Sequence, residues 1–358
     1  MAGMESLFSP PIRCILDVKG FTTESEVIWW PLRENVPTSQ LGEVHSNAGE
    51  TSAGAQTRNK IQGSRMSDVV TVMFMIPGNP GLIDYYEEFL TTIHETTPHP
   101  LVIYGVSHLG HSPAIRQASA PAHYHHHHSK PSRLYSLDDQ IRHKVQVIRD
   151  IMHKAYNHQH VHVLVVGHSV GAYIAGKAIQ ELTQSDWEAQ WDLRCIGLFP
   201  TLFDIAKTPN GNVLKHLFPH RTFASGLLGF LSLLPTPVLP RLLSMFTEPH
   251  PTTLHLLNPH ILPQAMYMAE CEMDEIGPLD KAWDNVSDKC LFYFSANDAW
   301  APKAWYDIVL ARLPQATTLL CDEDLPHAFV LGYSQNVAQK MVGWLDDLVR
   351  MGSWRARE

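Results

Sequence analysis

The sequence predicts an α/β fold in which a mostly parallel, doubly wound sheet is interrupted by one large insertion. Strand-like apolar runs alternate with helix-like amphipathic stretches along most of the chain. The run VVTVMFMI over 69–76 contains almost no polar residue, which is typical of a strand covered on both faces. The alternation stops between 201 and 287 and then resumes, so this stretch is expected to be inserted into the sheet-forming core.

Each expected element follows from a local pattern, with continuous apolar runs read as strands and apolar positions every three or four residues read as helices. Asp84 and Glu87 have the spacing of a capping box, which favours a helix start there. In chain order we expect strands at 12–18, 27–30, 69–76, 101–106, 161–166, 195–199, 290–294 and 317–321, and helices at 84–97, 137–152, 171–183, 302–313 and 335–350.

Composition narrows the class of protein. The chain has 358 residues, 44% of them hydrophobic, so it can bury a full core. A net charge of -9 without any run of Lys or Arg disfavours nucleic-acid binding. Five scattered cysteines without a C-x-x-C pair fit a reducing compartment, and no secretion signal is evident near the first Met. We therefore expect a soluble or peripheral intracellular protein. Separately, we expect this protein to be a monomer.

The expected organisation has three parts. Residues 1–200 and 288–358 form the core, and 201–287 form a cap and lipid-contacting insertion that includes an amphipathic helix near 261–269. Two low-complexity segments, 35–67 and 115–133, bury too little apolar surface to fold and are expected to be disordered inserts. The run His125 to His128 lies in the second insert without acidic or Cys partners, so we expect no metal and no other cofactor.

The central motif is Gly167-His168-Ser169-Val170-Gly171, which lies directly between an apolar strand and a helix. This arrangement is that of a nucleophile elbow, a tight turn that raises a serine hydroxyl above the sheet edge. The two glycines let strand and helix approach closely, and the helix N-terminus stabilises developing negative charge. Ser169 is the expected nucleophile.

A serine nucleophile needs a base and a carboxylate that orients the base. In chains of this pattern the order is Ser, acid, His. Asp298 follows the strand at 290–294, and His327 lies in the loop after the last strand, so these two are the expected acid and base. Asp322 and Asp324 lie near His327 but are expected in a solvated turn.

An oxyanion hole needs two backbone N–H donors. One is expected from Val170, which follows the nucleophile, and the other from the turn PGNPG at 77–81. Pro80 has no N–H group, so Asn79 is the first candidate and Gly81 the second.

Motifs along nearly the whole chain, apart from the two inserts and the ends, support a more specific assignment. PGNPG, YGVSHLGHS, YSLDDQIRHKVQVI, GHSVGAY, LFPT followed by TPNG, NDAWAP and LPHAF together resemble the lipid droplet-associated serine hydrolase family of the α/β-hydrolase superfamily. The resemblance implies an α/β-hydrolase fold, an esterase-type site for lipid esters such as sterol esters and acylglycerols, and residence on lipid droplets and the endoplasmic reticulum.

Carrying the family's triad over to this sequence selects Ser169, Asp298 and His327 again. Two positions depart from the wider superfamily. Pro77 stands where a His often precedes the glycine of the oxyanion loop, and Ser295 stands where a Gly is common three residues before the acid. Neither departure removes a reacting group.

The insertion contains an uncharged apolar stretch at 222–240, bracketed by Arg221 and Arg241. Two glycines and two central prolines disfavour a straight transmembrane helix and are compatible with a hairpin that dips into one leaflet. A closed apolar cap over a lipid-binding cleft, or a buried helix pair, fits the same composition. The expected lipid contacts are Leu227, Leu228, Phe230, Leu231, Leu233 and Leu234.

We therefore expect a serine ester hydrolase that acts on lipid esters through an acyl-enzyme at the cytosolic face of lipid droplets or the endoplasmic reticulum. Two alternatives remain open at this point. One is a protein that binds or organises lipid droplets with little hydrolytic activity, and the other is a soluble esterase or thioesterase for small acyl groups.

Overall fold

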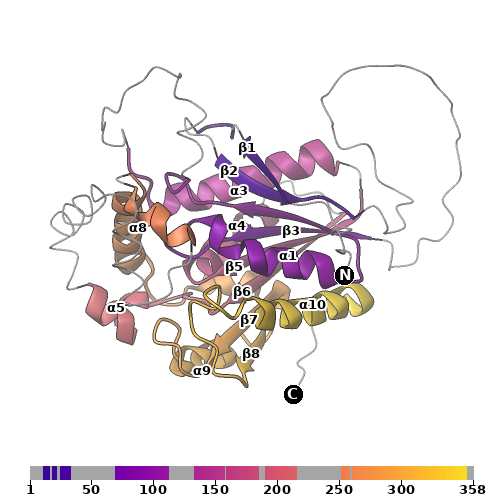
Figure 1. The fold of residues 1–358 in the computed structure, drawn as a ribbon. Helices are drawn as coiled ribbons and strands as arrows, with labels where there is room; N and C mark the ends of the chain where they lie inside the picture. Colours follow the sequence, from indigo (N-terminus) through magenta and orange to yellow (C-terminus); the bar gives the residue numbers. More distant parts are fainter. Residues whose placement is uncertain are drawn as a thin grey trace, which may run out of the picture.

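Eight strands form one sheet in the order β1-β2-β4-β3-β5-β6-β7-β8 (Figure 1). The computed structural model describes residues 11–16, 18–21, 25–33, 69–112, 133–157, 159–184, 190–215, 251–258 and 260–352. β2 is antiparallel to both of its neighbours, and every other pair is parallel. The strands are β1 (Ile12–Leu16), β2 (Ser25–Trp30), β3 (Val70–Ile76), β4 (Leu101–Val106), β5 (Val161–His168), β6 (Trp191–Leu198), β7 (Cys290–Ser295) and β8 (Thr317–Cys321).

Helices cover both faces of this sheet, which confirms the predicted α/β fold with a mostly parallel sheet. Along β3, Phe74 belongs to the core beneath α3 and α4, whereas Met73 and Met75 belong to the core beneath α1 and α10. Alternate side chains of a strand point to opposite faces, so the apolar run fills two cores at once. The helices are α1 (Glu87–Thr96), α3 (Leu137–Ala155), α4 (Val170–Thr183), α5 (Pro209–Leu214), α8 (Ile261–Glu275), α9 (Lys303–Arg312) and α10 (Ser334–Met351), with short 3₁₀ helices η2 (Ile83–Tyr86), η3 (Ile205–Lys207), η5 (Pro251–Leu257), η6 (Lys281–Asn285) and η7 (Ser287–Lys289).

The predicted capping box at Asp84 is wrong. The expected helix is split into η2 and α1, and α1 has no side-chain cap. Asp84 instead forms an ion pair with Arg13 of β1 at 2.7 Å. A capping box that the sequence analysis did not identify begins α3, where the Ser136 hydroxyl accepts from the backbone N–H of Asp139.

Several strand boundaries differ from their predictions by one or two residues, and the start of β6 differs most. β6 begins at Trp191 rather than at 195. The prediction began too late because the first half of the strand alternates buried apolar residues with the half-buried Asp192 and Arg194. Asp192 bonds to His162 on the neighbouring strand β5, so the polar positions are satisfied across the sheet. An apolar-run criterion does not detect such a segment.

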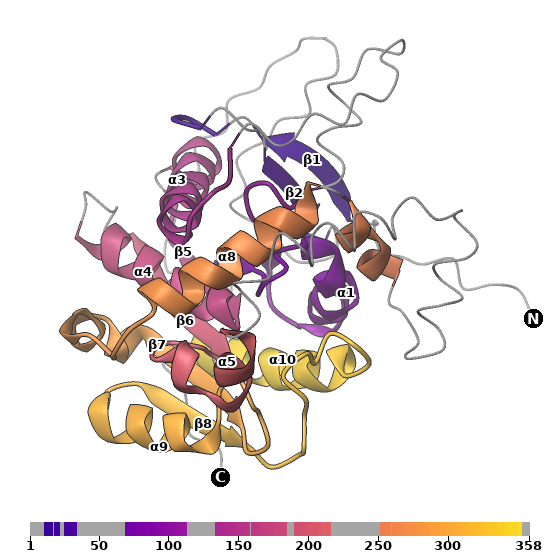
Figure 2. The ribbon, with the colours of Figure 1, turned by 90° about the vertical axis from the view of Figure 1, so that its left-hand side faces the viewer.

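The described part of the insertion includes α8, which is longer than the predicted 261–269. Figure 2 shows α8 running diagonally in front of the sheet, and it contacts η3, η5 and α3. None of the helices within the described ranges is long and apolar enough to cross a membrane. The insert 35–67, the histidines at 125–128 and the apolar stretch 222–240 with its six expected lipid contacts lie outside the described residues.

Candidate active site

Ser169 occupies a sharp turn between the end of β5 and the start of α4, with backbone angles φ 55° and ψ -125°. Such angles are costly for a residue with a side chain and are typical of a nucleophile elbow. The turn is possible because both flanking glycines lie against backbone. A Cβ at Gly167 would lie 2.1 Å from the carbonyl oxygen of Gly171, and a Cβ at Gly171 would lie 2.3 Å from that of Ile76.

The structure brings the three expected reacting residues together. His327 Nε2 lies 2.9 Å from Ser169 Oγ, and His327 Nδ1 lies 2.6 Å from Asp298 Oδ2. Asp298 follows β7, and His327 follows β8, so adjacent strands deliver both to one edge of the sheet. The alternative carboxylates point elsewhere, because Asp324 accepts from Asn297 and Asp322 pairs with Lys340.

Asp298 is held as a buried anion. Its Oδ1 accepts from the backbone N–H groups of Trp300 and Ala301 at 2.7 and 3.0 Å, while Oδ2 faces His327. Burial by itself would raise the pKa of Asp298, but the hydrogen bond and charge of His327 and the two backbone donors lower the pKa below its ordinary value. An ionised Asp298 keeps the proton of His327 on Nδ1, so Nε2 can accept the hydroxyl proton of Ser169.

Two backbone N–H groups near Ser169 are available for an oxyanion. Val170 is the first residue of α4, so its N–H has no acceptor within the helix. The N–H of Asn79 donates to no acceptor among the described residues, and its neighbour Gly78 lies so close that a Cβ there would be 3.0 Å from Ser169 Cβ. Gly81, the second candidate, already donates its N–H to the Gly78 carbonyl oxygen at 2.6 Å, which favours Asn79.

A buried series of hydrogen bonds joins the turn at 77–81 to the loop of His327. Tyr86 Oη accepts from the Gly78 N–H at 2.9 Å and lies 2.7 Å from His168 Nδ1, while His168 Nε2 lies 2.8 Å from the His327 carbonyl oxygen. Burial, aided by the charge of His327, lowers the pKa of His168 to about 3, and burial raises that of Tyr86. His168 is therefore neutral, and because a carbonyl only accepts, its proton lies on Nε2.

His168 was expected in the elbow, but the contacts of Tyr86 and Ser295 were not expected from the sequence. The Ser295 hydroxyl donates to the Leu325 carbonyl oxygen at 2.7 Å, two residues before His327. Ser295 stands where the wider superfamily often has a Gly, and its hydroxyl links the end of β7 to the loop of His327. No local signal identifies either residue, because the partner of each lies on a different loop.

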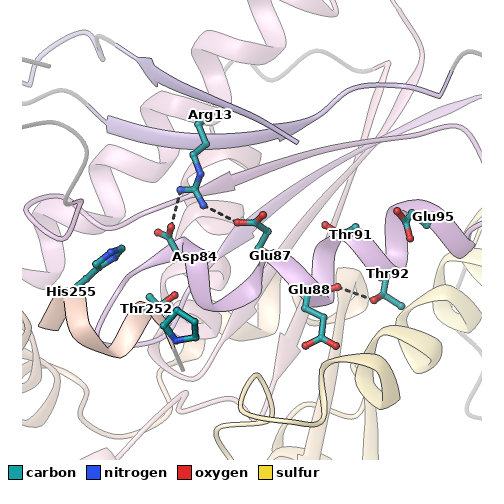
Figure 3. A pocket seen from close by; sticks show the side chains of 10 residues that line it. Arg13, Asp84, Glu87, Glu88, Thr91, Thr92, Glu95, Thr252 and His255 are labelled. Carbon is teal, nitrogen blue, oxygen red and sulfur yellow. Dashed lines mark hydrogen bonds and ion pairs between the residues drawn. The ribbon is translucent and has the colours of Figure 1, made fainter. Parts of the chain in front are cut away.

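A surface cavity of about 650 Å³ lies away from these groups (Figure 3). It is bounded by α1, by Arg13 of β1 and by η5, and no residue of the Ser-His-Asp arrangement lines it. Its acidic side chains are Asp84, Glu87, Glu88 and Glu95. The polarity of these walls does not suit an apolar ester, so we do not place the reaction there.

This chain is also similar to known proteins in sequence and in fold. The family model described as lipid-droplet associated hydrolase matches residues 70–330. Lipid droplet-associated hydrolases from Homo sapiens and Drosophila melanogaster are 26% identical over 292 residues and 28% identical over 281 residues. These alignments cover 78% and 75% of this chain, respectively, and 86% of each relative.

Among solved structures, the fold is similar to a thermophilic esterase from Thermogutta terrifontis (TM-score 0.52, 10% identity, covering 94% of this chain and 99% of the other). It is also similar to a bromoperoxidase from Bacillus anthracis (TM-score 0.54, 12% identity, covering 94% and 100%). At these identities the likeness concerns the fold alone, and it is that of the α/β-hydrolases.

Proposed function

Because this chain belongs to the lipid-droplet associated hydrolase family, we propose that it is a serine ester hydrolase for lipid esters of the sterol ester or acylglycerol type. The observation that carries the proposal is the continuous hydrogen-bonded arrangement of Ser169, His327 and Asp298 at a strained elbow. Its order and geometry are those needed to activate a serine hydroxyl for attack on an acyl carbon.

In the proposed reaction, His327 Nε2 takes the Ser169 proton as Oγ attacks the ester carbonyl carbon. The N–H groups of Val170 and Asn79 stabilise the negative oxygen of the tetrahedral intermediate. His327 then gives its proton to the leaving alcohol, and the acyl group remains on Ser169. His327 then takes a proton from water, which attacks the acyl-enzyme, and returns that proton to Ser169 Oγ as the fatty acid leaves.

The proposed location is the surface of lipid droplets or the cytosolic face of the endoplasmic reticulum, with the chain bound peripherally as a monomer. The support is compositional. The stretch 222–240 has no charged residue, and burial of its leucine and phenylalanine side chains in a monolayer would gain roughly 0.8 kcal/mol per methylene. In this arrangement Arg221 and Arg241 keep their charges at the headgroups on either side.

Labelling with a fluorophosphonate probe tests the proposed chemistry, since the probe reacts covalently with activated serines. Wild-type protein should be labelled at Ser169 and should hydrolyse emulsified cholesteryl or glyceryl oleate. Ser169→Ala should lose both signals. Labelling that persists undiminished in the Ser169→Ala variant would show that the nucleophile is another residue.

Microscopy of tagged variants tests the proposed location separately. Asp placed at Leu228, Leu231 and Leu234 together should release the protein into the cytosol, whereas Ser169→Ala should stay bound. Thermal denaturation checks that the triple variant is folded. A folded triple-Asp variant that still coats droplets would place the attachment elsewhere in the chain.

A further inference from the structure

The side chain of Asn79 joins the oxyanion loop to helix α8 of the insertion. Its carboxamide nitrogen donates to the Ala265 carbonyl oxygen and to Glu272 Oε1, each at 2.9 Å. Both N–H bonds of the amide are therefore used on one helix. Ala265 and Glu272 lie seven residues apart, two turns of helix, so they share the buried face of α8.

Glu272 is an unusual partner for this contact. It is 4% exposed, and no Lys, Arg or His of the described chain forms an ion pair with it. Burial raises the pKa of Glu272 to about 8, and only the hydrogen bond from Asn79 opposes that shift. At neutral pH the side chain is therefore mostly a neutral carboxylic acid whose carbonyl oxygen accepts from Asn79.

We propose that Glu272 is a positioning residue for the reaction at Ser169 and acts through Asn79. The inference rests on the proposed function, in which the backbone N–H of Asn79 is the second oxyanion donor. Fixing the carboxamide of Asn79 against α8 also limits how far its own backbone can turn. Oxyanion donors stabilise the transition state because they are held in place before the reaction, and a shift of about 1 Å can cost about 10²-fold in rate.

A second contact fixes α8 itself. Gln264, the residue before Ala265, accepts from the backbone N–H of Tyr135 at 2.8 Å and donates to its carbonyl oxygen at 2.7 Å. This two-way contact holds the same part of α8 to the chain that leads into α3. The helix is thus a fixed support against which Glu272 can hold the loop of Asn79.

The ionisation of Glu272 should make the reaction rate depend on pH, which a purely structural contact would not do. An ionised Glu272 would place a negative charge against the residue that must stabilise a negative oxygen, so the rate should fall as Glu272 ionises. No charged group changes the pKa of Glu272. The other titratable groups on α8 and on the elements packed against it are Tyr267, Glu270, Cys271, Asp274 and Glu275 of α8, Lys207 of η3, His255 of η5, and Asp138, Asp139, Arg142, His143, Lys144, Arg149, Asp150, His153 and Lys154 of α3.

The test compares the second-order rate of fluorophosphonate labelling and the kcat and KM for a soluble ester across pH 6–10, for wild type, Glu272→Gln and Glu272→Ala. Glu272→Ala should lower the labelling rate and kcat by about 10- to 100-fold with KM changed by less than about threefold. Gln copies the neutral acid and still accepts from Asn79, so Glu272→Gln should restore the rate to within about threefold of wild type at pH 7. Wild type should lose activity near pH 8, and Glu272→Gln should lose this alkaline decline.

Two controls separate the outcomes. Asp274→Ala removes an exposed carboxylate from the same helix and should leave rate and pH profile unchanged. Asn79→Ala combined with Glu272→Ala should lose little more than either variant alone, because both remove one contact.

Absence of labelling in wild type would contradict the proposed function. Labelling at a wild-type rate in folded Glu272→Ala, or an alkaline decline that persists in Glu272→Gln, would overturn the inference. If Glu272→Ala does not fold, the pH profiles of wild type and Glu272→Gln are sufficient to test the inference.

Discussion

The imidazole of His168 donates from Nε2 to the backbone carbonyl oxygen of His327, at 2.8 Å and across 159 residues of sequence. The residue before the proposed nucleophile therefore holds the loop that carries the proposed base. Tyr86 completes the link by donating to His168 Nδ1 and accepting from the Gly78 N–H. One series of hydrogen bonds thus connects the elbow, the loop of Gly78 and the loop of His327.

Removal of the Tyr86 hydroxyl should disturb this series of hydrogen bonds. Tyr86→Phe leaves the Gly78 N–H and His168 Nδ1 without a partner, which should cost about 1–3 kcal/mol of unfolding free energy. We expect kcat to fall by about tenfold with little change in KM, because loop positions rather than substrate contacts change. Tyr85→Phe is the matched control, since the Tyr85 hydroxyl bonds to Thr253 instead. Equal kcat values for the two variants would contradict a positioning role for Tyr86.

Replacement of the orienting carboxylate should separate geometry from charge. Asp298→Asn keeps the shape of the side chain but favours the wrong tautomer of His327, so turnover should fall by up to about 10⁴-fold while the protein stays folded. Asp324 is exposed and accepts a hydrogen bond from Asn297 rather than from His327, so Asp324→Asn should retain wild-type turnover. Steady-state kinetics and circular dichroism check both. A larger loss in Asp324→Asn would mean that the wrong carboxylate is assigned.

The elbow should tolerate no side chain at its second glycine. A Cβ at Gly171 would lie 2.3 Å from the Ile76 carbonyl oxygen, so Gly171→Ala must push α4 from β3 and should yield little folded protein. Gly343 of α10 has no atom within 4 Å of its expected Cβ. Gly343→Ala should therefore stabilise the chain by about 0.5–1 kcal/mol through helix propensity. Thermal denaturation compares the melting temperatures of Gly171→Ala and Gly343→Ala. Similar values for the two variants would contradict this prediction.

The raised pKa of Glu272 makes stability depend on pH. Burial moves this pKa from its ordinary value near 4.5 to about 8, so the folded state keeps a proton that the unfolded state releases between these values. Relative to Glu272→Gln, wild type should be most stable below pH 4.5 and lose stability up to about pH 8, by at most about 1.4 kcal/mol per pKa unit. Urea unfolding at pH 5, 7 and 9 checks the sign. If the difference in unfolding free energy between wild type and Glu272→Gln does not change with pH, Glu272 is ionised in the folded protein at these pH values.

Several site features could be predicted because their signals are local. The elbow combines a strand, two glycines and a helix within about twenty residues around Ser169, and each part has a recognisable pattern. Asp298 and His327 were identified because each follows a strand, and parallel strands deliver their carboxyl ends to one edge. The failed capping box at Asp84 shows the limit of such patterns, since a cation from β1 competed for the carboxylate.

By itself, the sequence determined the α/β architecture, the family and the candidate reactive residues, because these depend on periodicity and on short motifs. Only the tertiary structure decided what supports those groups. Tyr86 and His168 are separated by 82 residues, and Asn79 and Glu272 by 193. Nothing in either short segment signals its partner, since a hydrogen bond between distant segments depends on where packing places them. Burial then determines the protonation of Glu272 and His168, because desolvation is a property of the surroundings rather than of the residue.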